Sequence, residues 1–135
     1  MSIIKLFISY ALTFAVFLLI DMAWLGLIAK GLYQKYLGGF LSEQVNWTAA
    51  IVFYLLFVAG VFIFAIMPSV EKGSVVSALV LGALFGFFTY ATYDLTNLAT
   101  LKNWPINIVF IDILWGAVLT SIVSTAGFYI VKLVQ

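Results

Sequence analysis

Residues 74–98, SVVSALVLGALFGFFTYATYDLTNL, decide the fold because they form a long apolar run with a single charged residue, Asp94. An α-helix rises about 1.5 Å per residue, so about 20 apolar residues cross the hydrocarbon core of a bilayer. Near the end of the run, one helical face carries Tyr90, Tyr93, Asp94 and Asn97. Because hydrocarbon does not solvate a carboxylate, we expect this face to meet other helices rather than lipid.

The first half of the same run carries small residues one helical turn apart, at Ala78, Gly82 and Gly86. Small side chains let two helix backbones approach closely inside a membrane. The spacing favours close packing against another helix of the same chain, with dimerisation through this face as the alternative.

The composition of the whole chain indicates an integral membrane protein. Of its 135 residues, 66% are hydrophobic and 8% are charged, and the mean hydropathy is +1.24. A soluble domain of this size needs more charge on its surface. We therefore expect one domain over residues 1–135, embedded in a bilayer.

The residue types that are missing exclude several kinds of chemistry. The chain has no cysteine and no histidine, which removes disulfides, thiolate nucleophiles, the usual haem ligand and most zinc sites. We expect no metal and no cofactor. The net charge is +1, so nothing favours nucleic acid as a partner. Any chemistry must come from Asp, Tyr, Asn, Ser, Thr, Trp or backbone groups.

Three further apolar runs accompany this one, and each is long enough to span a bilayer. They predict an all-α integral membrane fold, an antiparallel up-down bundle of four transmembrane helices with both termini on one side. We place the helices at about residues 3–28, 46–67, 74–98 and 105–131.

The connections between these helices carry their own signals. Residues 29–45 mix tyrosines and leucines with lysines, which favours a short interfacial segment after the first helix, broken at Gly38-Gly39. We expect Pro68 to stop the second helix, so that residues 68–73 form a tight polar turn.

Polar residues of all four helices fall at one depth when residues are counted inward from one membrane surface. Asp21, Tyr54, Asp94 and Asp112 lie about 8–12 Å below that surface at about 1.5 Å per residue. With two tyrosines and an asparagine on its own face, Asp94 is expected to be the central carboxylate. The candidate ligand-binding residues are Asp21, Trp24, Tyr54, Tyr90, Tyr93, Asp94, Asn97, Asp112 and Trp115.

No cation is expected within this polar layer. Adjacent ionised carboxylates repel one another in a low dielectric, so we expect at least one to be protonated at neutral pH unless a cation binds. Two roles are open for the aspartates. They form a site for a ligand or a proton, or they only lock the helices together through hydrogen bonds.

Motifs on all four helices make the chain similar to a known family. They are Asp21-x-x-Trp24-Leu25, Phe53-Tyr54, Tyr93-Asp94-Leu95-Thr96-Asn97 followed by Trp104-Pro105, and Asp112-x-x-Trp115-Gly116. With these motifs the chain resembles an uncharacterised bacterial membrane-protein family, domain of unknown function 2177, over nearly its whole length. The resemblance implies four transmembrane helices and a location in the bacterial inner membrane, with no activity to transfer.

One class of function that fits these residues is the binding or transport of a small cationic or amphipathic ligand. An acidic layer walled by tryptophan and tyrosine attracts a cation through its charge and through the ring faces. The small multidrug-resistance transporters, with four helices and a membrane carboxylate, are an architectural analogy only, because their signature sequence is absent here.

The alternative class is a membrane-embedded aspartyl hydrolase or lipid-modifying enzyme, for which we assign no catalytic residue. Lipoprotein signal peptidase is similar in its helix number and in a Trp104-Pro105 pair before Asp112. The spacing of that motif differs here, however, and the chain has no arginine to complete the family's second motif. The sequence therefore favours a protein that is not an enzyme.

Membrane lipid is an expected partner, and a homodimer is a second. The expected bundle places three lysines at each membrane surface, so the positive-inside rule gives no orientation and a dual-topology dimer stays open. The two groups are Lys5, Lys72 and Lys132 on one surface and Lys30, Lys35 and Lys102 on the other.

Overall fold

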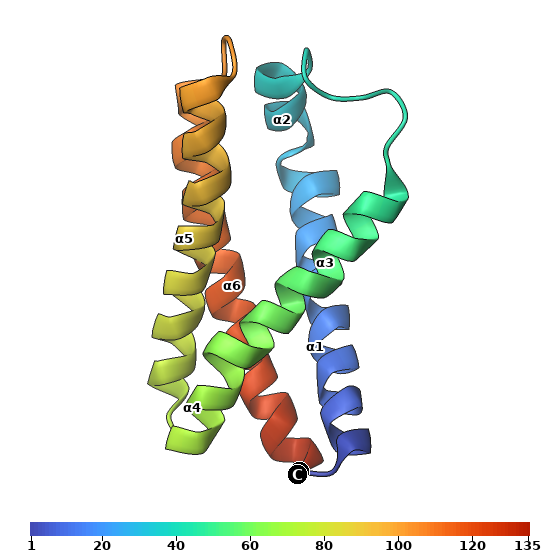
Figure 1. The fold of residues 1–135 in the computed structure, drawn as a ribbon, viewed down its shortest axis with the longest axis vertical. Coiled ribbons are helices and arrows are strands. Elements are labelled where there is room, and N and C mark those ends of the chain that lie inside the picture. The colour runs from blue at the N-terminus through green and yellow to red at the C-terminus, as the bar shows by residue number, and fades with distance from the viewer.

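The computed structural model describes residues 1–135, and all of its regular elements are helices (Figure 1). Two of them, η1 and η2, are π-helical turns. In chain order the elements are α1 (Ile3–Ala23), η1 (Trp24–Ile28), α2 (Lys30–Leu37), α3 (Trp47–Val61), η2 (Phe62–Ile66), α4 (Met67–Lys72), α5 (Val75–Thr100) and α6 (Ile106–Val134).

Four helical stretches are long and apolar enough to cross a membrane, which confirms the predicted fold class. They are Ile3–Ile28, Trp47–Lys72, Val75–Thr100 and Ile106–Val134, with mean hydropathies of 2.4, 2.8, 1.9 and 2.1. Successive stretches run in opposite directions, and the blue N-terminal end and the C-terminus lie at the same end of the bundle (Figure 1). Large apolar side chains cover the outer faces of the helices, so the bundle contacts lipid.

Polar side chains define where several helices begin. The Ser2 hydroxyl accepts the Lys5 N–H at 3.3 Å, Asn46 Oδ1 accepts the Ala49 N–H at 3.1 Å, and Ser74 Oγ accepts the Ser77 N–H at 3.1 Å. Each bond satisfies a backbone donor that the first helical turn leaves free.

The helices α5 and α6 pack against each other more extensively than any other pair, and the small residues of α5 make this close packing possible. A Cβ atom on Gly82 would lie 2.6 Å from the Thr120 carbonyl oxygen, and one on Gly86 would overlap the Gly116 carbonyl group. Ala78 is also fully buried. The prediction that this face packs within the chain is confirmed, and the close approach fixes α5 against α6 beside the polar layer.

Pro68 does not stop the second helix, so that prediction is wrong. The helix continues through α4 to Lys72, and the chain turns at Gly73, whose φ of 64° lies in the left-handed region. A proline has no N–H for the helical ladder, but Pro68 follows the π-helical turn η2 and occupies the first turn of α4. The change of hydrogen-bond register at η2 accommodates the missing donor.

The helix α3 leans across the bundle, so that its N-terminal end diverges from α5 (Figure 1). It crosses α1 diagonally in Figure 1, where the Tyr10 hydroxyl donates to the Leu55 carbonyl at 2.7 Å and Phe17 packs against Phe57. Nearer its start, Trp47 is 66% exposed and Phe53 is 54% exposed. Because α5 does not cover this half of α3, the bundle is open there toward the lipid.

The short helix α2 confirms the predicted segment after the first span, and it ends at Leu37 before Gly38. Instead of presenting all of its apolar side chains to the membrane, α2 packs against the N-terminal part of α6. Leu37 lies buried with Trp104, Ile108 and Val109. This packing brings the first half of α2 over the polar layer.

The topology predicts which side of the membrane each connection faces. Cysteines introduced at Ser42 and Asn103 should react with an impermeant thiol reagent added to one side of sealed vesicles. Cysteines at Ser2, Glu71 and Gln135, which are exposed at the opposite end, should react only from the other side. Ser69 is unsuitable as a probe because it is fully buried. A mixed pattern within either group would contradict the four-span arrangement.

Candidate ligand-binding site

A cavity of about 500 Å³ lies where α1, α2, α3, α5 and α6 meet, and we call it the acidic cavity. It gathers every candidate residue from the sequence except Asp94 and Asn97. Its two carboxylates come from different helices, Asp21 from α1 and Asp112 from α6, and both are largely buried. Its walls are Asp21, Trp24, Leu25, Lys30, Tyr33, Gln34, Leu37, Leu41, Phe53, Tyr54, Tyr90, Tyr93, Asp112 and Trp115.

The two Asp-x-x-Trp motifs contact each other at this cavity. Trp24 and Trp115 stack with ring centroids 4.2 Å apart and an interplanar angle of 10°. The Trp115 indole N–H donates a long hydrogen bond of 3.5 Å to Asp21 Oδ1. Each motif therefore turns its tryptophan toward the other helix, and the stacked pair holds α1 and α6 at the site.

Tyr33 of α2 connects the two motifs by hydrogen bonds, and sequence reasoning missed it. Its hydroxyl donates to Asp112 Oδ1 at 2.6 Å and accepts the Trp24 indole N–H at 3.2 Å. Burial, followed by the charge of Asp112, raises the pKa of Tyr33 above its ordinary value, so the phenol remains a donor at neutral pH. The only sequence signal was its place in an aromatic segment directly after the Asp21-x-x-Trp24 motif.

Asp94 lies behind Asp112 and does not line the acidic cavity. Its side chain is 0% exposed, and neither of its carboxyl oxygens has a hydrogen-bond partner. Its polar neighbours are the Asp112 carboxyl and the indole of Trp104, whose buried N–H also lacks a partner. Asn97 is partly buried and lies beside Tyr93. Asp94 was expected to be the central carboxylate of the site, but it is Asp112 that lines the cavity together with Asp21.

A lysine is among the walls of the acidic cavity, which the sequence did not predict. Lys30 and Gln34 of α2 both line it. Counting along the chain put Lys30 at the end of the first helix, outside the layer. In the structure Lys30 begins α2, which packs against α6, and its side chain lines the cavity while staying exposed.

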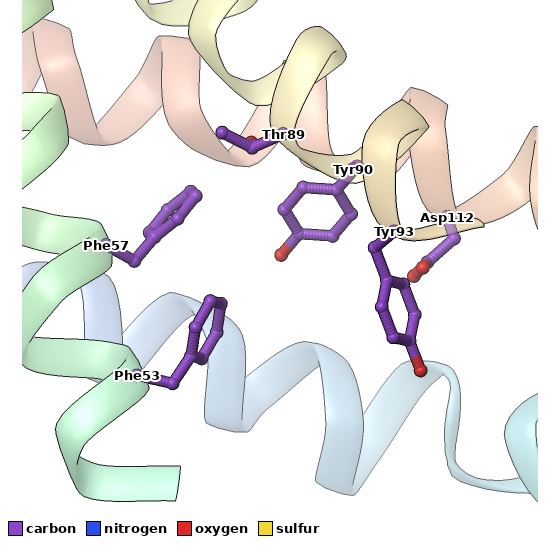
Figure 2. A pocket seen from close by; sticks show the side chains of 6 residues that line it. All are labelled: Phe53, Phe57, Thr89, Tyr90, Tyr93 and Asp112. Carbon is purple, nitrogen blue, oxygen red and sulfur yellow. The ribbon is translucent and has the colours of Figure 1, made fainter. Parts of the chain in front are cut away.

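A second cavity, of about 450 Å³, adjoins the first between α3 and α5, and we call it the apolar cavity. In Figure 2, Phe53 and Phe57 on α3 face Tyr90 across it, and the Tyr90 hydroxyl points into the space. Sequence reasoning did not single out Phe53, Phe57 and Thr89 as wall residues, because aromatic and threonine residues recur on all four membrane spans. The walls are Phe53, Phe57, Thr89, Tyr90, Tyr93 and Asp112.

Four apolar spans, with carboxylates and stacked aromatic rings buried between them, define the class of this chain, a multi-pass membrane protein. The model of the family described as "Predicted membrane protein (DUF2177)" matches residues 6–129. The chain therefore belongs to this family. No curated protein and no solved structure matches it at a significant level.

Proposed function

We propose that this protein binds, or carries across the membrane, a small cationic or amphipathic molecule in the acidic cavity. The observation that supports this most is that Asp21 and Asp112, from two different helices, line one cavity of about 500 Å³. Cavities of about 300–1,000 Å³ have the size that small ligands occupy.

The charge of the acidic cavity suits a cation. Asp21 and Asp112 are opposed by only one ammonium group, that of Lys30, among the cavity walls. The Lys30 side chain is exposed, so water screens its charge. The carboxylates are buried, so a cation that reaches them meets little competing solvent.

The aromatic walls add a second source of attraction. Trp24, Tyr54, Tyr90 and Trp115 line the same space as the carboxylates. A cation over an aromatic face gains about 0.5–2 kcal/mol, with more for a desolvated site. Quaternary and other weakly hydrated cations benefit most, because they lose little hydration on entering.

The hydrolase alternative receives less support from the geometry. An aspartyl hydrolase needs two neighbouring carboxyl groups that both reach the same water and substrate. Asp21 and Asp112 share the acidic cavity, but each already accepts a hydrogen bond, from Trp115 and from Tyr33. Asp94 and Asp112 are in closer contact, but Asp94 is fully buried and lines neither cavity. Asp112 alone of this pair faces the space where a substrate would lie.

The proposed location is the inner membrane of a bacterium, and this rests on the motifs that resemble the family. A homodimer is not needed to build the acidic cavity, because five helices of one chain supply its walls. We keep the homodimer as a proposed partner whose effect would be on orientation rather than on the site.

The proposal predicts that Asp112→Asn weakens the binding of a compact organic cation. Benzyltrimethylammonium added to the detergent-purified protein should bind, and isothermal calorimetry with indole fluorescence should report it. Removing one member of a buried charge pair costs about 2–5 kcal/mol, which is about 30-fold or more in affinity. The neutral isostere neopentylbenzene, in which carbon replaces the ammonium nitrogen, should not compete.

Glu71→Gln is the matched control, because it removes the same charge from an exposed position in α4 at the opposite end of the bundle. Its affinity for benzyltrimethylammonium should equal that of the wild type. Absence of binding to the wild type, or equal losses in Asp112→Asn and Glu71→Gln, would reject the cation site.

A further inference from the structure

The acidic and the apolar cavity share part of their walls. Phe53, Tyr90, Tyr93 and Asp112 line both the acidic and the apolar cavity. Asp112 is the only carboxylate common to the two. A molecule with its charge at Asp112 therefore has a neighbouring space of about 450 Å³ available for the rest of its structure.

Apart from Asp112 and the hydroxyls of Tyr90 and Tyr93, the walls of the apolar cavity offer little to a polar group. Phe53 and Phe57 supply aromatic faces (Figure 2). The Thr89 hydroxyl already donates within its own helix, to the Phe85 carbonyl at 2.8 Å and the Gly86 carbonyl at 3.2 Å. The walls suit hydrocarbon, which gains free energy by leaving water and needs no hydrogen bonds.

The position of the apolar cavity gives it access to lipid. It lies between α3 and α5, on the side where α3 leans away from the bundle. Phe53 in its wall is itself 54% exposed, and Trp47–Lys72 and Val75–Thr100 are both membrane spans. The space therefore opens sideways toward the hydrocarbon of the bilayer.

The two cavities lie at different depths in the membrane, in the same order as the head group and the alkyl chain of an amphiphile. Asp112 is about 9 Å from the start of α6, whereas Thr89 is about 16 Å from the end of α5 at the same surface, at about 1.5 Å per residue. The acidic group is thus nearer the surface and the apolar wall nearer the bilayer centre.

We propose, on the basis of the proposed function, that the ligand is a cationic amphiphile with a single alkyl chain that reaches the site from within the bilayer. Its ammonium head lies in the acidic cavity at Asp21 and Asp112. Its alkyl chain lies in the apolar cavity against Phe53, Phe57 and Thr89. An ordinary lipid chain that fills the apolar cavity without regard to charge is the competing occupant, and the test separates the two.

The experiment compares benzyltrimethylammonium with octyl-, decyl- and dodecyltrimethylammonium at one fixed detergent concentration. In the wild type, affinity should rise with chain length, by at least about tenfold from the benzyl to the dodecyl compound. Thr89→Phe fills the apolar cavity and should abolish this gain while leaving benzyltrimethylammonium affinity within about twofold of the wild type.

Thr92→Phe is the matched control for this variant. Thr92 is on the same helix and its hydroxyl also donates within that helix, to the Phe88 carbonyl at 2.6 Å, but it is exposed and lines neither cavity. Thr92→Phe should keep the full gain with chain length. Partition of the ligands into micelles is the same for all variants, so it cancels from the comparison.

A second measurement holds even where Thr89→Phe does not fold. A dodecyltrimethylammonium with a diazirine at the end of its chain should crosslink to peptides that contain Phe57 and Thr89 in the wild type, and unmodified dodecyltrimethylammonium should prevent this. Crosslinking elsewhere, or an equal gain with chain length in Thr89→Phe, would overturn the alkyl-chain site.

The outcomes for the two proposals differ. Binding of benzyltrimethylammonium without a gain from longer chains would overturn the amphiphile inference and leave the cation site intact. Equal crosslinking by dodecanol carrying the same diazirine, unaffected by Asp112→Asn, would identify an ordinary lipid chain as the occupant. Absence of benzyltrimethylammonium binding would remove the cation site on which this inference rests.

Discussion

Gly86→Ala is expected to destabilise the protein by about 3 kcal/mol, the upper part of the usual range for overpacking a close interface. A Cβ at this position would overlap the Gly116 carbonyl group of α6. The obstacle is backbone rather than a flexible side chain, so the two helices must move apart. Reversible unfolding in mixed micelles of increasing denaturing detergent measures the change in the free energy of unfolding.

Gly31→Ala is the matched control, because Gly31 is also helical but has no atom within 4 Å of an added Cβ. There the substitution should stabilise α2 by about 0.5–1 kcal/mol, since alanine has the higher helix propensity. Equal stability of Gly86→Ala and the wild type would show that α5 and α6 do not meet as described.

The same interface positions the site, so Gly86→Ala should also reduce ligand binding. A Cβ on Gly116 would overlap the ring of Tyr90, which lines both cavities. Separation of α5 from α6 therefore shifts Tyr90 relative to Asp112. This coupling of packing and site explains why glycines lie at this depth of the bundle.

Much of the site was predictable from the sequence because helix geometry is nearly rigid. A fixed rise per residue converts a count from the membrane surface into a depth, and this brought Asp21, Tyr54 and Asp112 to one level. The structure places all three around the acidic cavity. The two Asp-x-x-Trp motifs, noted in the sequence for their family resemblance, meet at the same cavity, where Trp24 and Trp115 stack.

The rest depended on tertiary packing that leaves no periodic signal. The position of Tyr33 and Lys30 follows from the contact of Leu37 with Trp104, two residues far apart in the chain. The lean of α3, which opens the apolar cavity, is a matter of how one helix crosses another. The π-helical turn η2, which lets the second span pass Pro68, has no sequence signature that we could use.

The rotation of α5 decided the place of Asp94. Tyr90, Tyr93 and Asp94 share a broad helical face, but the sequence does not say which part of that face points at the cavity. In the structure Tyr90 and Tyr93 line it, and Asp94 points toward α6. Adjacent residues of a helix point in different directions, so Tyr93 lies in the cavity wall whereas Asp94 lies behind it.

Asp94→Asn is expected to abolish most of the proton release that accompanies cation binding. The Asp94 carboxyl adjoins that of Asp112 and has no hydrogen-bond partner. Two ionised carboxylates in such contact repel each other strongly, so we expect Asp94 to carry a proton when the site is empty. A cation bound at Asp112 offsets this repulsion, favours ionisation of Asp94 and so displaces that proton.

Asparagine is the informative replacement because it keeps the shape of Asp94 and cannot ionise. Its amide N–H can donate to Asp112, as the protonated Asp94 carboxyl can. The variant should therefore fold and bind benzyltrimethylammonium within a few-fold of the wild type. In the wild type affinity should increase with rising pH, because fewer protons compete with the cation, whereas in Asp94→Asn this dependence should be much weaker.

Proton release in lightly buffered detergent solution, measured with a pH dye as benzyltrimethylammonium is added, tests this directly. The other ionisable groups that face Asp112 are Asp21, Lys30, Tyr33, Tyr54, Tyr90 and Tyr93. Glu43→Gln, which removes an exposed carboxylate from the loop before α3, should release as many protons as the wild type. Release from a folded Asp94→Asn protein equal to that of the wild type would assign the proton to another carboxylate, Asp21 first, and would leave Asp94 with a structural role. Loss of release together with retained binding would instead identify Asp94 as the group that couples the cation to a proton.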